Sequence, residues 1–231
     1  MNYNKSFENF IRKSHTYEDL YDFVMKSDNI CPLKENVFRF MYQDISKAKV
    51  IILGMDPYSS TYEKDGVEVP VATGRSFEVA NVERWTDSYR QVSLTNIFKA
   101  LAYKRFGEIY TMNELRSIVN EKNFRYINIH DWFDAMEKEG VVFLNATLTT
   151  IMHKTGAHIN VWARFMDELI KYIVDSTKDI KWLIWGESAR KRVFNLVDDK
   201  NIVYTCHPAS RVKNTFVKDC CFEKILNVNW V

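Results

Sequence analysis

The 231-residue sequence contains only seven glycines, four prolines and four cysteines. The cysteines, Cys31, Cys206, Cys220 and Cys221, have neither CxxC metal spacing nor the pattern of a disulfide framework. There is no signal peptide and no apolar run near the roughly 18 residues of a membrane span. We therefore expect a cytoplasmic protein without a membrane partner. Repeats, low-complexity tracts and proline-rich linkers are also missing, which favours a single domain over residues 1–231.

Several site types are missing as well. No glycine-rich phosphate loop follows any predicted strand, and Ser93 and Ser188 lack the context of a nucleophile elbow. His153 and His158 are too far apart for one helix face and have no helpful acid nearby, so no metal site or cofactor is expected. The formal charge of +2 is too small to indicate a nucleic-acid binder by itself, and any basic surface would have to be local.

The most informative stretch begins with the apolar run Val50–Leu53, which stops at Gly54 and leads into Asp56, Pro57 and Tyr58. A short β-branched run bounded by Gly and Pro predicts a buried strand of a parallel sheet. Pro57 cannot donate to a sheet ladder, so Asp56 lies on a turn at the carboxyl end of that strand. Ordinary turn chemistry also explains Asp-Pro-Tyr, and the stretch taken alone favours that interpretation over a functional one.

Three further apolar runs predict strands at 141–145, 181–185 and 201–206, and the segments between them have helical spacing. Helices are expected over 93–101, from Thr111, and over 131–139, 158–175 and 187–197. The alternation predicts an α/β fold with three α/β/α layers and a central, mainly parallel four-stranded sheet. Residues 1–46 are expected to form a helical N-terminal cap on a catalytic core over 47–231. The polar segment 59–74 is expected to be a long, functional loop.

Polar residues follow each predicted strand. Asp56, Asn145, the turn Gly186-Glu187-Ser188 and His207 come directly after the four runs. Because parallel strands point their carboxyl ends the same way, we expect these residues to share one edge of the sheet, where ligands bind in open α/β sheets. An acid, an amide and a histidine at that edge predict a catalytic crevice.

At these residues the sequence resembles the uracil-DNA glycosylases, specifically family 1. The family's GQDPYH is similar to Gly54-Met-Asp-Pro-Tyr-Ser59, its GLAFSV to Gly74-Arg-Ser-Phe-Glu-Val79, and its SLxNIxKxL to residues 93–101. Its GVLLLNxxLTV resembles residues 140–150, and the following G-S/A-H with a tryptophan resembles Gly156-Ala-His158 and Trp162. Its LLWGxxA is similar to 183–189, its HPSPLS to 207–212, and its closing I-D/N-W to Asn227-Val-Asn-Trp230. The resemblance covers residues 47–231 in the same order.

The resemblance implies flipping of uracil out of DNA, hydrolysis of its N-glycosidic bond, and an abasic site for base-excision repair, without metal or cofactor. Asp56 would stabilise the cationic sugar and orient water, and a neutral His207 would donate to the uracil oxygen. In the uracil pocket Asn145 would hydrogen-bond the base edge, Phe77 would stack, Tyr58 would exclude the thymine methyl, and Met55 would replace the family's Gln. DNA contacts would come from Ser93, Gly186, Glu187, Ser188, Pro208, Ser210, Arg211 and Lys213.

The sequence also departs from the family pattern. Ser59 replaces the histidine after Tyr58, the segment before Phe77 is longer, and the sequence alone favours a core position for Phe77 over an exposed stacking ring. Arg211 replaces the wedge leucine, and a guanidinium can fill a base gap by stacking. The proline-rich loop before residue 93 is absent. Two alternatives to the enzyme therefore stay open: a catalytically weak or inactive DNA-binding or scaffold protein, and a glycosylase with altered base choice. Expected partners are uracil-containing DNA and an inhibitor protein of these enzymes, with the protein itself a monomer.

Overall fold

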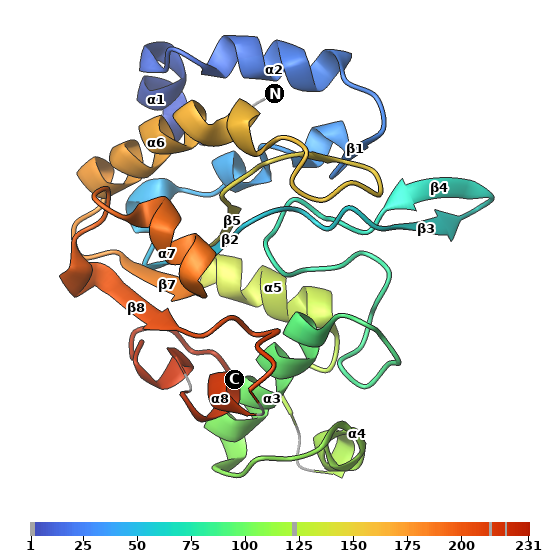
Figure 1. Ribbon diagram of the computed structural model, residues 1–231. Helices are drawn as coiled ribbons and strands as arrows, with labels where there is room; N and C mark the ends of the chain where they lie inside the picture. Colours follow the sequence, from blue (N-terminus) through green and yellow to red (C-terminus); the bar gives the residue numbers. More distant parts are fainter. Residues whose placement is uncertain (1–2, 122–123, 213, 220) are drawn as a thin grey trace.

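The computed structural model describes residues 3–121, 124–212, 214–219 and 221–231. Its centre is a parallel four-stranded sheet in the order β5-β2-β7-β8 (Figure 1). The strands are β2 (Val50–Gly54), β5 (Val141–Asn145), β7 (Lys181–Trp185) and β8 (Ile202–Thr205). Every residue of β2 and β5 is buried, as expected for β-branched strands covered on both faces. The predicted fold class is confirmed, and the three apolar runs after the first lie within one residue of their predicted bounds.

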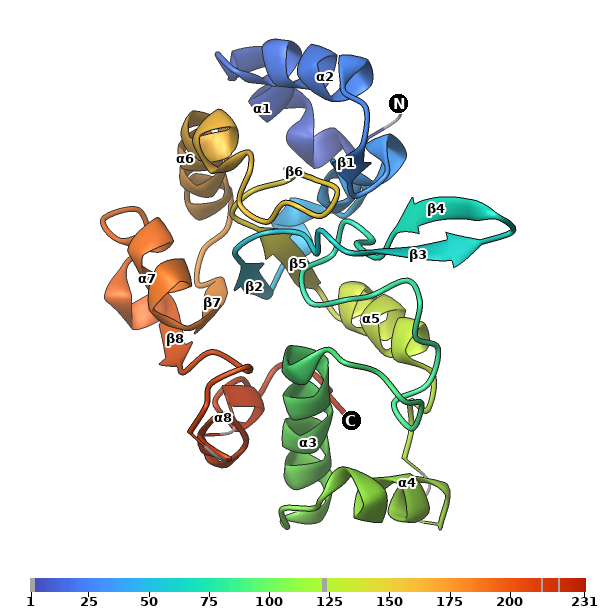
Figure 2. The ribbon, with the colours of Figure 1, turned by 45° about the vertical axis from the view of Figure 1, so that its right-hand side comes forward.

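Helices cover both faces of this sheet and give it two separate cores. Alternate residues of β2 point to opposite sides, so Val50 and Ile52 join one core while Ile51 and Leu53 join the other. The first core is completed by α3 (Val92–Phe106), α4 (Met112–Glu121), α5 (Ile129–Lys138) and α8 (Thr215–Lys218). The second is completed by α1 (Glu8–Lys13), α2 (Tyr17–Lys26), α6 (Ile159–Ser176) and α7 (Glu187–Val193). Figure 2 shows the two groups on either side of the strands.

Local signals set the helix ends. Thr111 and Glu114 form the predicted capping box: the Thr111 N–H donates to Glu114 Oε2 over 2.6 Å, and the Glu114 N–H donates to Thr111 Oγ1 over 3.3 Å. Helix α5 begins two residues before its predicted start because the Asn128 side chain accepts from the backbone N–H groups of His130 and Asp131. Gly140, with φ +93°, follows its end.

The N-terminal segment is only partly helical. After α1 and α2 the chain forms the short strand β1 (Ile30–Cys31), which pairs antiparallel with β6 (Thr150–Ile151). Single 3₁₀ turns complete the chain: η1 (Lys5–Phe7), η2 (Lys34–Asn36), η3 (Arg39–Tyr42), η4 (Ile45–Lys47), η5 (Asp199–Asn201) and η6 (Cys221–Glu223). The prediction of helices throughout 1–46 was wrong at β1, where pairing with a distant segment overrides the local pattern.

The prediction of a loop over 59–74 was also wrong. This segment contains an antiparallel hairpin of β3 (Thr61–Lys64) and β4 (Val67–Pro70), which extends away from the body of the protein (Figure 2). Asp65 and Gly66 form the turn with φ values of 53° and 77°, as a two-residue hairpin turn requires. Among the described residues, no helix is long and apolar enough to span a membrane.

Candidate active site

The ends of the four central strands meet at one edge of the sheet. Gly54 at the end of β2 lies opposite Asn145 at the end of β5, and Trp185 at the end of β7 lies opposite Thr205 of β8. Asp56 and His207 each follow two residues beyond their strands, so the structure brings Asp56, Asn145, Gly186 and His207 to one edge. The topology therefore brings these residues to one edge of the sheet, as the order of strands and helices predicts.

Asp56 is a half-buried carboxylate with two different oxygens. Its Oδ2 accepts a hydrogen bond from the backbone N–H of Gly156. Its Oδ1 is buried and has no hydrogen-bond partner in the described parts of the chain. Burial raises the pKa of Asp56, and the hydrogen bond from Gly156 opposes this by stabilising the charged form. A buried acceptor without a protein partner leaves a position at which a substrate or a water can bind.

The turn that presents Gly156 to Asp56 is fixed by hydroxyl groups. Thr150, which is fully buried, donates to the Lys154 carbonyl over 2.6 Å and accepts from the Ala157 N–H over 3.3 Å. The same turn is tied to the segment after Tyr58, because the hydroxyls of Ser59 and Thr155 are 3.0 Å apart. The turn that carries Asp56 and the turn that carries Gly156, about a hundred residues apart in sequence, are therefore fixed to one another.

Asn145 is 5% exposed, and its side-chain amide makes no hydrogen bond within the described residues. It lies against Gly54, where a Cβ atom would overlap its Oδ1 and come within 2.8 Å of the Ser76 Cβ. Ser76 is itself fully buried and donates to the Ile52 carbonyl over 3.1 Å. The amide is thus closely confined and leaves its donor and acceptor for a ligand.

Phe77 packs against the first core, and its ring lies close to His207 at this edge. Its ring centroid is 4.8 Å from that of Trp185 and 6.2 Å from that of His207. Its φ of +67° is unusual for a bulky side chain. Tyr58 packs with Phe77 against the same core, and burial raises the pKa of Tyr58 to about 12. The Phe77 ring, packed on Trp185, therefore forms an aromatic wall beside the histidine.

The hydrogen bonds of His207 define its tautomer. The Ala209 N–H donates to His207 Nδ1 over 3.1 Å, so in the neutral ring Nε2 carries the proton. His207 is exposed overall, but the side of its ring facing Gly186 loses water, and this desolvation lowers its pKa. Gly186, with φ +97°, permits this approach because a Cβ there would lie 3.0 Å from the His207 Cβ. The site thus offers a neutral N–H donor.

The residues predicted to contact DNA are less closely grouped. Glu187 and Ser188 are exposed at the start of α7, and Arg211 is exposed beyond His207. Pro208 is buried, and its carbonyl accepts from Asn96 Nδ2 of α3 over 2.6 Å. Ser210 is half-buried, whereas Ser93 is only 9% exposed in the first turn of α3. Lys213 lies outside the described residues.

Met55 directly precedes Asp56 and packs against a different core from Phe77 and Tyr58. Its side chain packs against the second core, whereas Phe77 and Tyr58 pack against the first. The Met55 carbonyl accepts from the Thr147 N–H over 2.9 Å. Within the described residues, no group of three or more His, Cys, Asp or Glu side chains could hold a metal ion.

The comparisons with known proteins agree with this geometry. No protein-family model matches the chain. A uracil-DNA glycosylase of Francisella tularensis subsp. holarctica is 30% identical over 200 residues, which cover 84% of this chain and 77% of that protein. The chain belongs to the uracil-DNA glycosylase superfamily. A second relative, from Francisella tularensis subsp. novicida, is 30% identical over 183 residues, 78% of this chain and 70% of its own length.

Solved structures of the superfamily have the same fold. A mimivirus uracil-DNA glycosylase variant in complex with UGI superposes with a TM-score of 0.66 at 25% identity, covering 90% of this chain and 70% of its own. The enzyme from Nitratifractor salsuginis superposes with a TM-score of 0.73 at 16% identity, covering 96% and 90%, and this likeness concerns the fold alone.

Some residues of this glycosylase site have no assigned role in the sequence-based prediction. Gly156 stands in a motif that resembles the family, but nothing in its spacing indicates that its N–H binds Asp56. Trp185 was predicted only as a strand residue, although it packs on Phe77. The close approach of Gly54 to Asn145 also depends on strand register, which a single strand's sequence does not give.

Proposed function

We infer that this chain removes uracil from DNA by hydrolysing the N-glycosyl bond and leaves an abasic site. The observation that carries this inference is the buried Asp56 Oδ1 without a hydrogen-bond partner, at the same sheet edge as an unpaired amide and a neutral histidine. Membership of the uracil-DNA glycosylases supports the same reaction. It does not favour the alternatives of a non-catalytic DNA-binding protein or a glycosylase with another base choice.

In the proposed reaction the bond between the sugar C1′ and the uracil N1 breaks, and its electron pair leaves with the base. Positive charge develops on the sugar and negative charge on uracil. The Asp56 carboxylate stabilises the cationic sugar, and its free Oδ1 orients the water that adds to C1′. The water gives up one proton to the carboxylate as the new C1′–O bond forms, and the uracil anion takes up a proton from solvent on release. The hydrogen bond from Gly156 holds Oδ2, whereas Oδ1 has no protein partner and is the oxygen assigned to the reacting groups.

His207 stabilises the departing base. Because Nδ1 accepts from Ala209, the proton on Nε2 can be donated to a uracil oxygen as negative charge develops there. Donors placed where charge appears contribute more than those that only bind the substrate. The lowered pKa of His207 keeps the ring neutral at physiological pH, so it acts as a hydrogen-bond donor without carrying a charge.

Three residues select the base. Asn145 pairs with the edge of a flipped uracil, and cytosine presents the opposite donor and acceptor, which would leave a buried amide unpaired at a cost of about 1–3 kcal/mol. Phe77 stacks on the ring. Tyr58 takes the space of the thymine methyl, and Met55 stands beside the water site at the position of the family's Gln.

Contacts with the DNA backbone are assigned to Ser93, the turn Gly186-Glu187-Ser188, Pro208, Ser210, Arg211 and Lys213. The family 1 subtype rests on the motifs, and the monomeric state and cytoplasmic location rest on the sequence alone. An inhibitor protein as partner is supported by the mimivirus relative, which was solved in complex with UGI.

The test is cleavage of an oligonucleotide with one uracil, read as alkali-labile strand breaks, beside matched oligonucleotides with thymine opposite guanine, cytosine and hypoxanthine. We expect breaks at uracil only, and slower cleavage of uracil by Asn145→Ala. Binding of DNA by the folded wild type without any breaks would refute the enzyme assignment. Breaks at another base would refute the proposed base choice.

A further inference from the structure

The segment that carries Phe77 is flanked by two buried charges. Arg75 is 5% exposed and Glu78 is 2% exposed, and residues of these types are almost never so buried unless they are paired. The glycosylase motif GLAFSV, which this segment resembles, has Leu and Ser at the positions of Arg75 and Glu78. The pair is therefore a feature of this chain that the resemblance does not account for.

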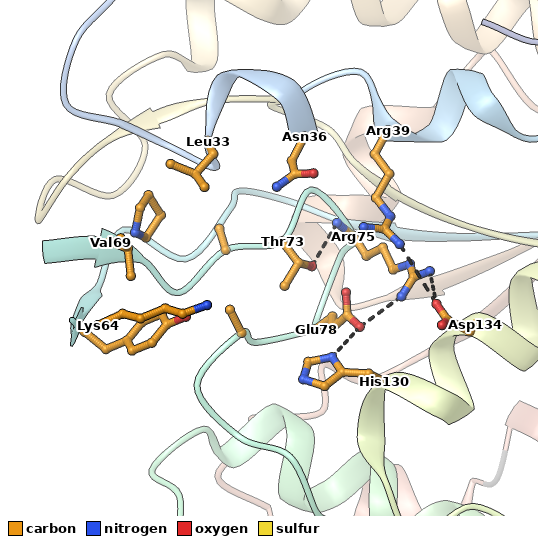
Figure 3. Close-up of a pocket in the computed structure, with 14 residues that line it drawn as sticks. Leu33, Asn36, Arg39, Lys64, Val69, Thr73, Arg75, Glu78, His130 and Asp134 are labelled. Atoms are coloured by element: carbon orange, nitrogen blue, oxygen red, sulfur yellow. Dashed lines mark hydrogen bonds and ion pairs between the residues drawn. The ribbon is translucent and has the colours of Figure 1, made fainter. Parts of the chain in front are cut away.

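Arg75 connects the segment to helix α5. Its Nη1 lies 3.0 Å from Glu78 Oε1, its Nε donates to Glu137 Oε1 over 2.8 Å, and its Nη2 lies 2.5 Å from Asp134 Oδ1. Glu78 makes a second tie to the same helix, because its Oε1 is 2.9 Å from His130 Nδ1 (Figure 3). Two charges of the segment are thus bound to three side chains of α5.

These contacts keep the buried carboxylate ionised. Burial alone would raise the pKa of Glu78, but the hydrogen bond with His130 and the charge of Arg75 outweigh it and hold the pKa below its ordinary value. The same hydrogen bond raises the pKa of His130. Removal of Arg75 would leave the buried Glu78 carboxylate held by His130 but without its guanidinium partner, and breaking a buried ion pair in this way is destabilising.

Phe77 lies between the two charges in a backbone conformation that needs support. A bulky residue at φ +67° persists only where its surroundings fix it. On one side Ser76 is tied to the Ile52 carbonyl of β2, and on both sides the Arg75–Glu78 pair is tied to α5. A cavity of about 520 Å³ adjoins Arg75 and Glu78, so the segment has room to shift once the pair is broken.

We propose that Arg75 and Glu78 form a coupled positioning pair that anchors Phe77 to α5 and so places its ring for stacking on uracil. The proposal rests on the proposed function, in which Phe77 stacks on the base. Arg75 and Glu78 do not touch the base themselves. They determine the 4.8 Å spacing between the rings of Phe77 and Trp185, and with it the shape of the aromatic wall beside His207.

The test compares wild type, Arg75→Leu, Glu78→Ser and the double variant, which carries the residues of the family motif. The measured quantities are the inhibition constant for free uracil, kcat/KM on a uracil oligonucleotide and the melting temperature. We expect Arg75→Leu to weaken inhibition by uracil about tenfold or more, the range for losing one base-stacking contact. The double variant should regain most of this loss, because no buried carboxylate is left unpaired.

Two further variants keep the result interpretable. Glu137→Gln retains a hydrogen-bonding shape beside Arg75 and should fold even if Arg75→Leu does not, with a several-fold weaker inhibition by uracil. Arg192→Leu is the matched control: it removes an ion pair of 2.6 Å to Asp167 between α7 and α6, and should lower the melting temperature without changing uracil inhibition.

The outcomes separate this inference from the proposed function. Folded wild type that does not cleave at uracil would refute the proposed function and, with it, this inference. Wild type that cleaves, together with Arg75→Leu and Glu137→Gln variants whose inhibition constants for uracil match wild type, would overturn the positioning role alone. If Arg75→Leu and the double variant have equal inhibition constants for uracil, both higher than that of wild type, the coupling between the two residues is contradicted.

Discussion

Gly54→Ala is the smallest change that tests the geometry of the base-selecting amide. Gly54 is the last residue of β2, and its backbone does not need the left-handed conformation, so alanine adds only a methyl group. That Cβ would lie 2.8 Å from the Ser76 Cβ, which is 0.6 Å less than the 3.4 Å at which ordinary contacts begin, and it would overlap Asn145 Oδ1 outright. Because Ser76 is fully buried, the amide of Asn145 is the group that must move.

A displacement of this size is expected to affect activity more than folding. Overpacking by one methyl group typically costs about 1–3 kcal/mol of stability. A misplacement of about 1 Å at a reacting group costs on the order of 100-fold in rate, so we expect kcat/KM at uracil to fall about 10- to 100-fold. The assays are kcat/KM on an oligonucleotide with one uracil and urea unfolding of the same preparation.

Gly66→Ala is the matched control. Gly66 lies in the turn between β3 and β4 with φ +77°, and a Cβ there would meet no atom within 4 Å. The left-handed conformation costs an alanine about 1 kcal/mol, but kcat/KM should stay at the wild-type value. A Gly54→Ala protein with wild-type kcat/KM, or an equal loss of activity in Gly66→Ala, would refute the steric reasoning.

Three further predictions concern ionisation and hydrogen bonding. Burial raises the pKa of Asp56, so this carboxyl group stabilises the folded protein below its ordinary pKa, and that stabilisation is lost as the pH rises through the raised value. Asp56→Asn should therefore leave the melting temperature at pH 7.5 no lower than that of wild type. A clear decrease in the melting temperature there would contradict this. Thr150→Val loosens the turn that brings the Gly156 N–H to Asp56, so the pKa of Asp56 should rise and the acid limb of the kcat/KM profile should move to higher pH. Thr177→Val is the control, because it removes a hydroxyl bond of 2.5 Å to the Ile173 carbonyl at the end of α6 and should leave the pH profile unchanged. His207→Leu should lower kcat about 100- to 1,000-fold. The acid limb of the pH–rate profile should remain, because a ring that is already neutral does not produce it. Loss of the acid limb in this variant would instead assign that limb to His207.

The arrangement of the site at the sheet edge could be predicted because it depends on topology. Four apolar runs bounded by Gly, Pro or polar residues give the strands, and parallel pairing then brings Asp56, Asn145 and His207 together whatever the intervening segments do. The hairpin at 61–70 was also within reach, since Asp65-Gly66 is a strong turn signal between alternating segments.

Other features depend on contacts between distant residues and have no local signal. The N–H of Gly156 reaches Asp56 across 100 positions, and Arg75 reaches α5 across about 60. The side on which Met55 packs follows from the turn after β2, whose geometry its sequence leaves open. Such contacts are decided by how whole elements pack, and no residue type or spacing at either partner indicates them.

The most direct test of the central claim is the single-turnover rate of uracil release by Asp56→Asn, compared with wild type and with Asp44→Asn. Asp44 caps a 3₁₀ turn away from the edge where the strands end, so its variant controls for loss of one carboxylate. If the unpaired Oδ1 of Asp56 orients the water and stabilises the cationic sugar, Asp56→Asn should be slower by several orders of magnitude, with DNA binding retained and Asp44→Asn near wild type. A rate for Asp56→Asn within a fewfold of wild type would contradict the assignment of this carboxylate.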